Sequence, residues 1–159
     1  MKAEIIKLKL ADFEKCGNIW DMQKQSQLAE QFYREMQNGI RSTYIYQIDG
    51  AFIGEISVVT DAGDPDYTIP GQRLYVSRLI VKSDHQRQGI GNRLVEFISE
   101  KAKNEGYKEL SVGVDLDNYP ALKLYHNAGF VLMLFVGKDQ WGQYMNCLLY
   151  TSPSPRDRG

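Results

Sequence analysis

The chain has only two cysteines among its 159 residues, Cys16 and Cys147, and they form no CxxC pair or other metal-binding pattern. This scarcity excludes a disulfide-stapled scaffold and a cysteine-based metal site, and it favours a reducing compartment. Long apolar stretches are also missing, because runs such as Phe130 to Val136 are too short to span a bilayer. We therefore expect a cytoplasmic protein with no metal ion and no membrane partner.

Neither sign of charge is in excess. Lysine and arginine number 19 and aspartate and glutamate number 20, which gives a formal net charge of −1. Proteins that hold nucleic acid need a basic surplus to neutralise phosphates, so no nucleic-acid partner is expected. A small local anion site remains compatible with this balance.

The sequence does contain an ordered series of strand-like and helix-like segments. Ile5 to Leu10 alternates apolar and polar residues, as a half-buried strand does, and Asp12 is suited to cap a first helix. Asp49-Gly50 is a strong signal for a two-residue hairpin. The further expected elements are a helix at 27–37, strands at 43–48, 52–59 and 74–81, a helix at 90–103, a strand at 110–114, a short helix capped by Asn118, and strands at 131–136 and 144–149. This order predicts an α/β fold, with the nearly continuous apolar strand 74–81 buried on both faces.

The last residues differ in kind from the rest. Residues 151–159 carry two of the five prolines and no large apolar side chain, so we expect them to be disordered. The stretch looks like translated vector sequence, which begins as early as Cys147 on this hypothesis. The expected organisation is one domain over residues 1–150 and a non-native tail over 151–159.

The segment from Val81 to Asn92 carries the first chemical signal. It leads from the end of a strand through Gly89 and Gly91 into a helix. The first N–H groups of a helix lack intrahelical partners and favour an anion, and glycines let the backbone approach a phosphate closely. The simpler interpretation is a tight strand-to-helix turn. The segment fits neither a phosphate loop of nucleoside triphosphatases nor the dinucleotide-binding fingerprint.

Two motifs in this chain resemble those of the GNAT superfamily of N-acetyltransferases. Gln86-x-x-Gly89-x-Gly91 matches the superfamily's Arg/Gln-x-x-Gly-x-Gly/Ala signature. Downstream, Asn118-x-x-Ala-x-x-Leu-Tyr125, followed by Gly129-Phe130, resembles its second signature. The resemblance implies a mixed, mostly antiparallel central sheet of about six to seven strands, splayed between strands four and five and flanked by about four helices.

The resemblance also implies a co-substrate, acetyl-CoA, and the residues that hold it. The backbone of the fourth strand would pair with the pantetheine arm, and the N–H near Leu79 would hold the thioester carbonyl. Amides from Arg87 onwards would hold the pyrophosphate, Gln86 would brace their loop, and Asn118 would bond the pantetheine arm while it caps its helix. The implied cofactor-binding residues are Leu79, Ile80, Val81, Gln86, Arg87, Gln88, Gly89, Ile90, Gly91, Asn92, Asn118 and Tyr125.

Acetyl transfer to an amine also needs an acid and a base. Tyr125 lies where the superfamily places the tyrosine that protonates the leaving thiolate, and the alternative for it is a packing role. Many members carry an acid just before Leu79, but this chain has Arg78 there. The candidate bases are therefore Glu55 and Asp115, each of which is alternatively a solvated carboxylate at a strand edge.

The expected function is an acetyl-CoA-dependent N-acetyltransferase that acts on a primary amine of a small molecule or a peptide by direct attack in a ternary complex. The alternative is a non-catalytic acyl-CoA-binding or sensing module of the same fold. Family members often dimerise, so a homodimer is a further expectation. Substrate selection is expected from Trp20 and Phe32, the loop from Asp61 to Gln72, and the segment from Lys138 to Tyr144. The identity of the amine is left open.

Overall fold

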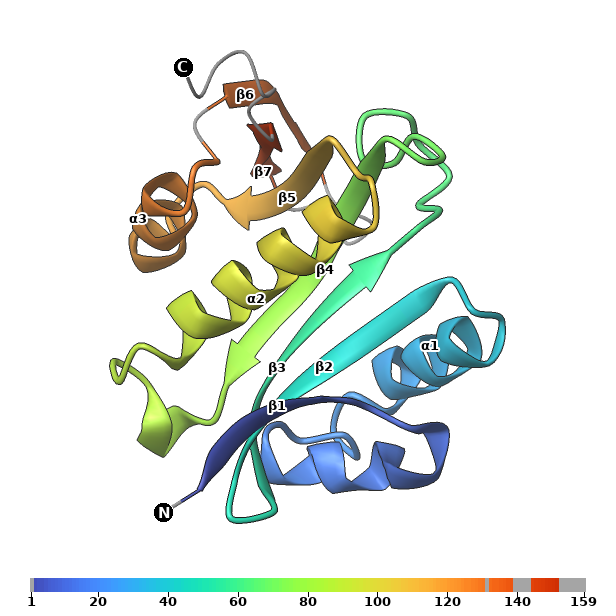
Figure 1. Cartoon of the computed structure of the whole chain (residues 1–159), viewed down its shortest axis with the longest axis vertical. Coiled ribbons are helices and arrows are strands. Elements are labelled where there is room, and N and C mark those ends of the chain that lie inside the picture. The colour runs from blue at the N-terminus through green and yellow to red at the C-terminus, as the bar shows by residue number, and fades with distance from the viewer. Residues whose placement is uncertain (1, 131, 139–143, 152–159) are drawn as a thin grey trace. The chain divides into compact units, whose positions relative to one another are not determined.

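A computed structural model describes residues 2–130, 132–138 and 144–151. Its strands are β1 (Ala3–Lys7), β2 (Arg41–Ile48), β3 (Ala51–Val59), β4 (Arg73–Val81), β5 (Glu109–Asp115), β6 (Leu132–Lys138) and β7 (Tyr144–Thr151). Its helices are the 3-10 helices η1 (Leu10–Asn18) and η2 (Ser83–His85) and the α-helices α1 (Ser26–Gln37), α2 (Ile90–Asn104) and α3 (Tyr119–Asn127) (Figure 1). The predicted α/β element order is confirmed.

The strands form a mixed, mostly antiparallel sheet, as expected. Their order is β1-β2-β3-β4-β5-β7-β6, which is seven strands with hydrogen-bonded neighbours. The β1–β2, β2–β3, β5–β7 and β6–β7 pairs are antiparallel, and β4–β5 is parallel. Residue contacts group the chain into a first unit, Met1–Val59 with Ser77–Val95, and a second unit, Thr60–Val76 with Glu96–Gly159. The predicted splay between β4 and β5 stays a prediction.

In the first unit, the hairpin of β2 and β3 forms as its turn residues indicate. Asp49 has φ 50° and Gly50 has φ 85°, so both central residues lie in the left-handed region. This is the geometry of a two-residue turn whose twist matches that of the flanking strands, and glycine adopts it without steric cost. The turn sets the register Ile48↔Ala51, and a one-residue irregularity between Tyr46 and Gln47 then brings Ile45 opposite Glu55.

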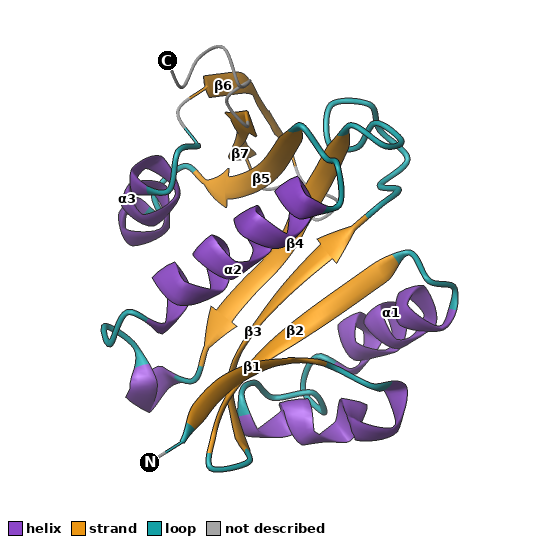
Figure 2. Ribbon diagram, in the orientation of Figure 1, coloured by secondary structure: helices purple, strands orange, loops and turns teal. Residues whose placement is uncertain are grey.

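Helices cover β3 of the first unit on two faces. On one face, η1 and α1 pack against the strands (Figure 2), and the cluster includes Phe32 and Ile45 together with the partly buried Ile80. On the other face, a Cβ added to Gly54 would lie 3.2 Å from Ile90 and 3.3 Å from Leu94 of α2. Glycine at position 54 therefore allows the first turns of α2 to approach the strand closely.

The start of the chain differs from the expectation. The first strand ends at Lys7 rather than Leu10, and Asp12 lies inside a 3-10 helix whose N-cap is Lys9, instead of capping an α-helix. Phe13 and Cys16 are three residues apart, and this spacing matches the three residues per turn of a 3-10 helix. The Asp12 carboxylate pairs instead with Lys15 at 3.1 Å.

The prediction that strand 74–81 is buried on both faces is wrong, because Tyr75, on the face opposite to Leu74 and Val76, is only half-buried. Leu74 and Val76 are buried, with 3% and 2% of their surface exposed. The residues from Ser77 to Val81 are only half-buried. The apolar residues Leu79 to Val81 do not reveal this difference, because their burial depends on which neighbouring elements cover the strand.

In the second unit, residues Arg73–Val76 of β4 run parallel to Glu109–Val112 of β5. Strand β5 also pairs with β7, in a register that extends from Glu109↔Thr151 to Asp115↔Met145. Thr151, placed in the expected tail, thus belongs to β7, and so does Cys147. The rest of that tail, 152–159, and residues 139–143 of the expected substrate-selecting segment lie outside the described residues.

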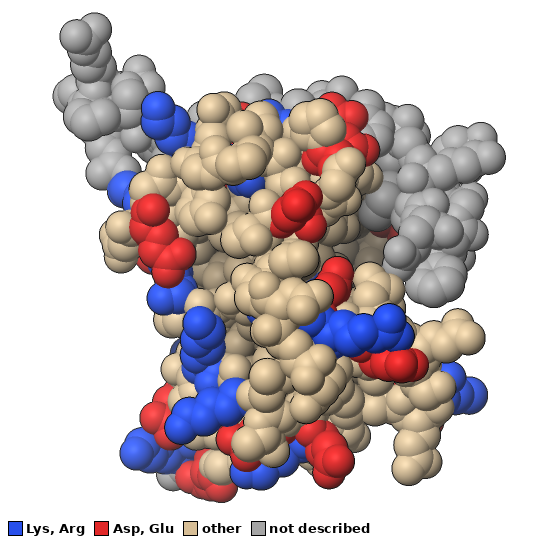
Figure 3. All heavy atoms as spheres, turned by 90° about the vertical axis from the view of Figure 1, so that its right-hand side faces the viewer, with Lys and Arg blue, Asp and Glu red and all other residues tan. Residues whose placement is uncertain are grey.

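The surface of the described chain fits the balanced composition. Acidic and basic side chains are interspersed on the face shown in Figure 3. In residues 2–130, 132–138 and 144–151, no helix has the length and apolar character needed to cross a membrane. The same part of the chain contains no group of three or more His, Cys, Asp or Glu side chains that could hold a metal ion.

Candidate functional site

The loop between β4 and α2 has a conformation that its sequence makes accessible. Gly89 has φ 79°, a value that side chains disfavour, and Arg87 also lies in the left-handed region with φ 65°. The Gln86 side chain donates from Nε2 to the carbonyl oxygen of Val81 at 3.2 Å. This bond ties the loop back to the end of β4, in the bracing position expected for Gln86.

The first turn of α2 presents free backbone amides beside this loop. The first intrahelical bond runs from the Arg93 N–H to the Gly89 carbonyl oxygen at 3.1 Å, so the amides of Ile90, Gly91 and Asn92 precede it. Ile90 is buried and anchors the turn, whereas Gly89 is exposed. A Cβ added to Gly89 would meet nothing within 4 Å, so the backbone there faces open space. This geometry suits a phosphate group.

The last residues of β4 lead directly into this loop. Leu79, Ile80 and Val81 are half-buried, and the parallel register of β4 with β5 ends at Val76, before them. Lys82 follows, and its N–H donates to the Ile53 carbonyl oxygen of β3 at 2.8 Å. The end of β4 is thus held by β3, and it joins a partly accessible strand to an anion-binding loop.

Glu55 is buried, contrary to the alternative of a solvated strand-edge carboxylate. Only 3% of its surface is exposed. Its Oε1 has no hydrogen-bond partner among the described residues. Burial raises the pKa of the Glu55 carboxyl above its ordinary 4.5. The charge of Arg78, the indole N–H of Trp20 and the charge of Arg41 act in the opposite direction without cancelling that rise.

Arg78 lies against aromatic rings on the same side of the sheet. Its guanidinium carbon is 4.4 Å from the centre of the Trp20 ring and 5.4 Å from that of Phe32. Such stacking stabilises a cation by its interaction with the ring faces. Burial lowers the pKa of the Arg78 guanidinium, and the charge of Glu55 partly restores it. Arg78 stands where many family members carry an acid. It thus lies near the acid Glu55 of β3.

Arg41 belongs to the same cluster, and no motif or spacing in the sequence points to it. Its side chain pairs with Glu35 at 3.0 Å and lies 3.9 Å above the Phe32 ring. An arginine at the first position of a strand is ordinarily read as a surface residue, yet only 6% of Arg41 is exposed. Its burial follows from α1, which covers the start of β2 with Phe32 and supplies Glu35.

Tyr125, in the second unit, is a buried residue of α3. It is 5% exposed, and its ring packs edge-on against Phe130 with 5.3 Å between centres. Burial raises the pKa of its hydroxyl well above the ordinary 10, and Tyr75 adds to that rise. The hydroxyl therefore keeps its proton at neutral pH, which an acid must do, and the ring also has the packing role that was the alternative.

Asn118 and Asp115 lie just before α3. The Asn118 Oδ1 accepts from the Ala121 N–H at 3.2 Å, so Asn118 caps the helix as expected. Asp115 ends β5 and is half-buried, and its carbonyl oxygen accepts from the Asn118 N–H at 3.1 Å. These contacts place both residues at one turn. Asp115 has none of the deep burial that distinguishes Glu55.

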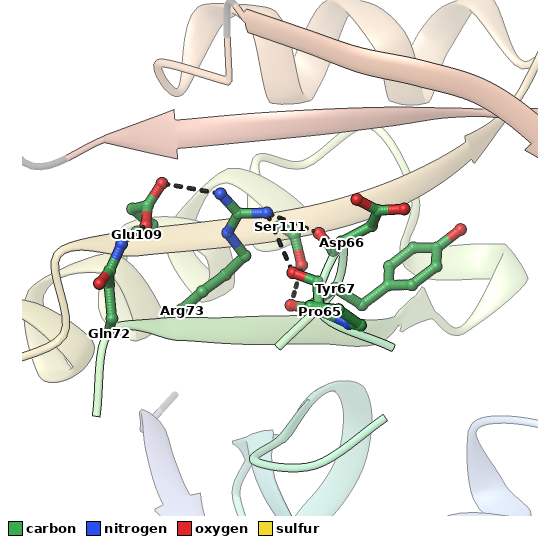
Figure 4. A network of polar contacts seen from close by, with 7 residues as sticks. All are labelled: Pro65, Asp66, Tyr67, Gln72, Arg73, Glu109 and Ser111. Atoms are coloured by element: carbon green, nitrogen blue, oxygen red, sulfur yellow. Dashed lines mark hydrogen bonds and ion pairs between the residues drawn. The ribbon is translucent and has the colours of Figure 1, made fainter. Parts of the chain in front are cut away.

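The loop from Asp61 to Gln72 is fixed to the second unit by a network of polar contacts (Figure 4). The Arg73 guanidinium donates to the Asp66 carbonyl oxygen at 2.8 Å and pairs with the Glu109 carboxylate at 3.0 Å. The Ser111 hydroxyl donates to the Tyr67 carbonyl oxygen at 2.6 Å. This loop, from which substrate selection is expected, is thus a segment held in place by polar contacts.

An open groove of about 940 Å³ lies in the first unit. It is bordered by η1, by the segment that leads from η1 to α1, and by the start of the β4–α2 loop. Its lining includes Phe13, Asn18, Trp20, Met22 and Lys82. Trp20 is shared between the groove and the stack on Arg78, so the groove opens beside the buried cluster.

The described architecture agrees with that of known acetyltransferases. Residues 4–130 match the model of the acetyltransferase (GNAT) family. An Elizabethkingia anophelis acetyltransferase of that family, solved with acetyl-CoA bound, superposes with a TM-score of 0.71 and 19% identity. The superposition covers 94% of this chain and 98% of that one.

Two curated proteins share sequence with part of the chain. Human N-acetyltransferase 8 is 35% identical over 65 residues, which are 41% of this chain and 29% of that protein. N-alpha-acetyltransferase 30 of Saccharomyces cerevisiae is 32% identical over 74 residues, which are 46% of this chain and 40% of that protein. The chain thus spans less than half the length of these two relatives.

Proposed function

This chain belongs to the acetyltransferase (GNAT) family, and from that premise we propose that it transfers the acetyl group of acetyl-CoA to a primary amine by direct attack in a ternary complex. The observation that carries the proposal is the β4–α2 loop. It combines free helix amides, an exposed Gly89 with open space beside it, and a partly accessible strand end. That combination suits a pyrophosphate with an extended arm, because amides bind the anion and a strand edge pairs with the arm.

The residues proposed to hold acetyl-CoA divide by role. The amides from Arg87 to Asn92 bind the pyrophosphate, and Gln86 keeps their loop against β4. The backbone of Leu79 to Val81 pairs with the pantetheine arm, with the Leu79 N–H on the thioester carbonyl. Asn118 and Tyr125 are the further residues that the resemblance to the family's second signature assigns to acetyl-CoA. Acetyl-CoA supplies an activated acyl group whose leaving atom is a thiolate sulfur.

The proposed chemistry requires two proton transfers. As the amine nitrogen bonds to the acyl carbon, Glu55 takes a proton from that nitrogen. When the carbon–sulfur bond breaks, the Tyr125 hydroxyl gives its proton to the thiolate. Burial prepares both groups, because it raises the pKa of the Glu55 carboxyl and so makes it a stronger base, and it keeps Tyr125 protonated. Asp115 remains the alternative base.

An amine screen tests the proposal. We expect acetyl-CoA to release free thiol in the presence of the protein and at least one class of primary amine, with the acetylated amine seen by mass spectrometry. Calorimetry on the same preparation measures acetyl-CoA binding. Tight binding of acetyl-CoA with no thiol release for any amine contradicts the enzyme and leaves the alternative, a non-catalytic acyl-CoA-binding module.

A charge placed at Gly89 tests the anion site. Gly89→Asp is expected to weaken acetyl-CoA binding by roughly 10- to 100-fold, because its carboxylate repels the pyrophosphate in a partly desolvated loop. Gly89→Asn is the matched control, since asparagine has the same shape and meets the same positive φ without a charge. Calorimetry of both variants isolates the charge effect. Equal affinities for the two variants place the phosphates elsewhere.

A further inference from the structure

The cluster formed by Glu55, Arg78 and Trp20 in the first unit contains buried polar atoms that lack hydrogen-bond partners among the described residues. Three buried atoms have no hydrogen-bond partner among the described residues: Glu55 Oε1, Trp20 Nε1 and Arg78 Nε. Burying such atoms without partners costs free energy, and native proteins ordinarily satisfy them. Because all three belong to one cluster, they indicate a place where a polar ligand binds.

The two charged members of the cluster face the same side of the sheet. Glu55 lies opposite Ile45, and Arg78 is two residues before Ile80 on β4, so strand alternation gives both the face on which Ile45 and Ile80 pack. Trp20 lies near both, because its ring stacks on Arg78 and its indole N–H, which has no hydrogen-bond partner among the described residues, still lowers the pKa of the Glu55 carboxyl. A carboxylate and a guanidinium thus lie on the same face of the sheet, each near the Trp20 side chain.

The two arginines near this cluster, Arg41 and Arg78, differ in their ion-pair partners. Arg41 already has a carboxylate partner in Glu35, at 3.0 Å. Arg78 has an aromatic stack and the nearby Glu55, but none of the ion pairs within 4.0 Å among the described residues includes either of them. A guanidinium presents five N–H donors in a plane and stays charged at neutral pH. Arg78 therefore has donors to offer to a ligand, whereas Arg41 is engaged by Glu35.

We propose that Glu55 and Arg78 recognise an α-amino carbonyl group, with the amine at Glu55 and the neighbouring carbonyl or carboxylate oxygen at Arg78. This inference rests on the proposed acetyl transfer and names its acceptor class. An α-amino carbonyl compound carries a donor and an acceptor one carbon apart, which complements an acid beside an arginine. Amino acids and peptide N-termini have this chemistry. A polyamine lacks the acceptor, and its further ammonium groups are repelled by Arg78.

Position supports the same assignment. Arg78 precedes Leu79, whose N–H is proposed to hold the thioester, so an amine held at this cluster lies near the acyl carbon. The groove whose lining includes Trp20 lies next to the cluster, because the same Trp20 ring stacks on Arg78. The arginine at the position of the usual acid is then a specificity-determining residue, and Glu55 on the next strand supplies the carboxylate.

The test compares amines that differ only in the carbonyl group. L-Phenylalaninamide and 2-phenylethylamine share the side chain and the primary amine. We expect kcat/KM for the amide to exceed that for the simple amine by roughly 10- to 100-fold, as charge-assisted hydrogen bonds allow. In Arg78→Gln this ratio is expected to fall to about one, and in Arg78→Lys to an intermediate value. Arg34→Gln, which removes an exposed arginine of α1, is expected to keep the full ratio.

A ratio near one in the wild type, or efficient acetylation of spermidine with no preference for the amide, overturns the inference while acetyl transfer stands. Calorimetry with L-phenylalaninamide on the complex with coenzyme A gives the same comparison without turnover. Preferential binding that Arg78→Gln abolishes, with no turnover, supports the inference and contradicts the enzyme. Failure of both readouts contradicts both. Acetyl-CoA binding by each variant checks that it is folded.

Two further arms separate the sources of the α-amino carbonyl group. Free L-phenylalanine carries a carboxylate, and the dipeptide phenylalanyl-alaninamide carries a peptide carbonyl. A higher kcat/KM for the free amino acid assigns amino acids as the acceptors, and a higher value for the dipeptide assigns peptide N-termini. Either preference supports the proposal, provided that it collapses in Arg78→Gln. A preference that survives in that variant contradicts it.

Discussion

Glu55→Gln is expected to lower the rate of acetyl transfer by roughly 10²- to 10⁴-fold, the usual contribution of a general base. Glutamine keeps the shape of the side chain but cannot accept the amine proton at neutral pH. The measurement is kcat under saturating acetyl-CoA and amine. Acetyl-CoA affinity is expected to stay the same, because Glu55 is not among the residues proposed to hold it.

The same substitution is expected to make the protein more stable at neutral pH. In the folded state burial raises the pKa of the Glu55 carboxyl above 4.5, its value in the unfolded chain. Above pH 4.5 the unfolded chain therefore releases a proton that the folded chain still holds. Stability falls as pH rises from there until the folded pKa is passed. Glutamine cannot ionise, so melting temperatures of the variant should lack this decline.

Two comparisons make the Glu55 result specific. Glu30→Gln removes an exposed carboxylate of α1 and is expected to change neither turnover nor the slope of melting temperature against pH beyond small effects. Asp115→Asn tests the alternative base at the end of β5. Full turnover in Glu55→Gln together with a large loss in Asp115→Asn transfers the role of base to Asp115.

Tyr125→Phe is expected to lower kcat by roughly 10²-fold or more while acetyl-CoA still binds. Phenylalanine retains the ring that packs against Phe130, so the fold loses little, and only the proton donor disappears. The raised pKa of the Tyr125 hydroxyl also predicts that the wild-type rate does not fall between pH 8 and 10 through loss of this proton.

The matched control for Tyr125 lies on the same helix. Tyr119, at the start of α3, is 72% exposed, so Tyr119→Phe removes a hydroxyl from α3 without touching its buried face. Steady-state kinetics and calorimetry of the two variants separate a chemical role from a packing role. If Tyr125→Phe turns over like the wild type, Tyr125 only packs α3, and the thiolate takes its proton from water.

Much of the architecture could be predicted from the sequence because the signals are local. The Asp49-Gly50 turn joins β2 to β3, the apolar stripe of α2 has helical spacing, and Asn118 caps α3 as its position indicates. Each feature depends on residues that lie within a few positions of each other. The β4–α2 loop is of the same kind, since Gly89 and the first amides of the helix are adjacent in the chain.

The first turns of the chain show where local signals fail. An apolar residue at every third or fourth position fits both an α-helix and a 3-10 helix, and the contacts of η1 with α1 and the sheet select the latter. Likewise, strand 74–81 is largely apolar, yet only Leu74 and Val76 are buried. The residues of these two segments do not by themselves determine the helix type or the burial, because both depend on the elements that pack against the segments.

The sequence by itself determined the family, the order of elements and the loop proposed to bind pyrophosphate, all through short motifs with fixed spacing. Only the tertiary structure decided that Glu55 is buried and that Arg78 stacks on aromatic rings near it. Trp20, Phe32, Glu55 and Arg78 come from the segment after η1, from α1, from β3 and from β4, and packing alone brings them together. Desolvation is a property of that assembly, so the raised pKa of a strand glutamate could not be read from its neighbours in the chain.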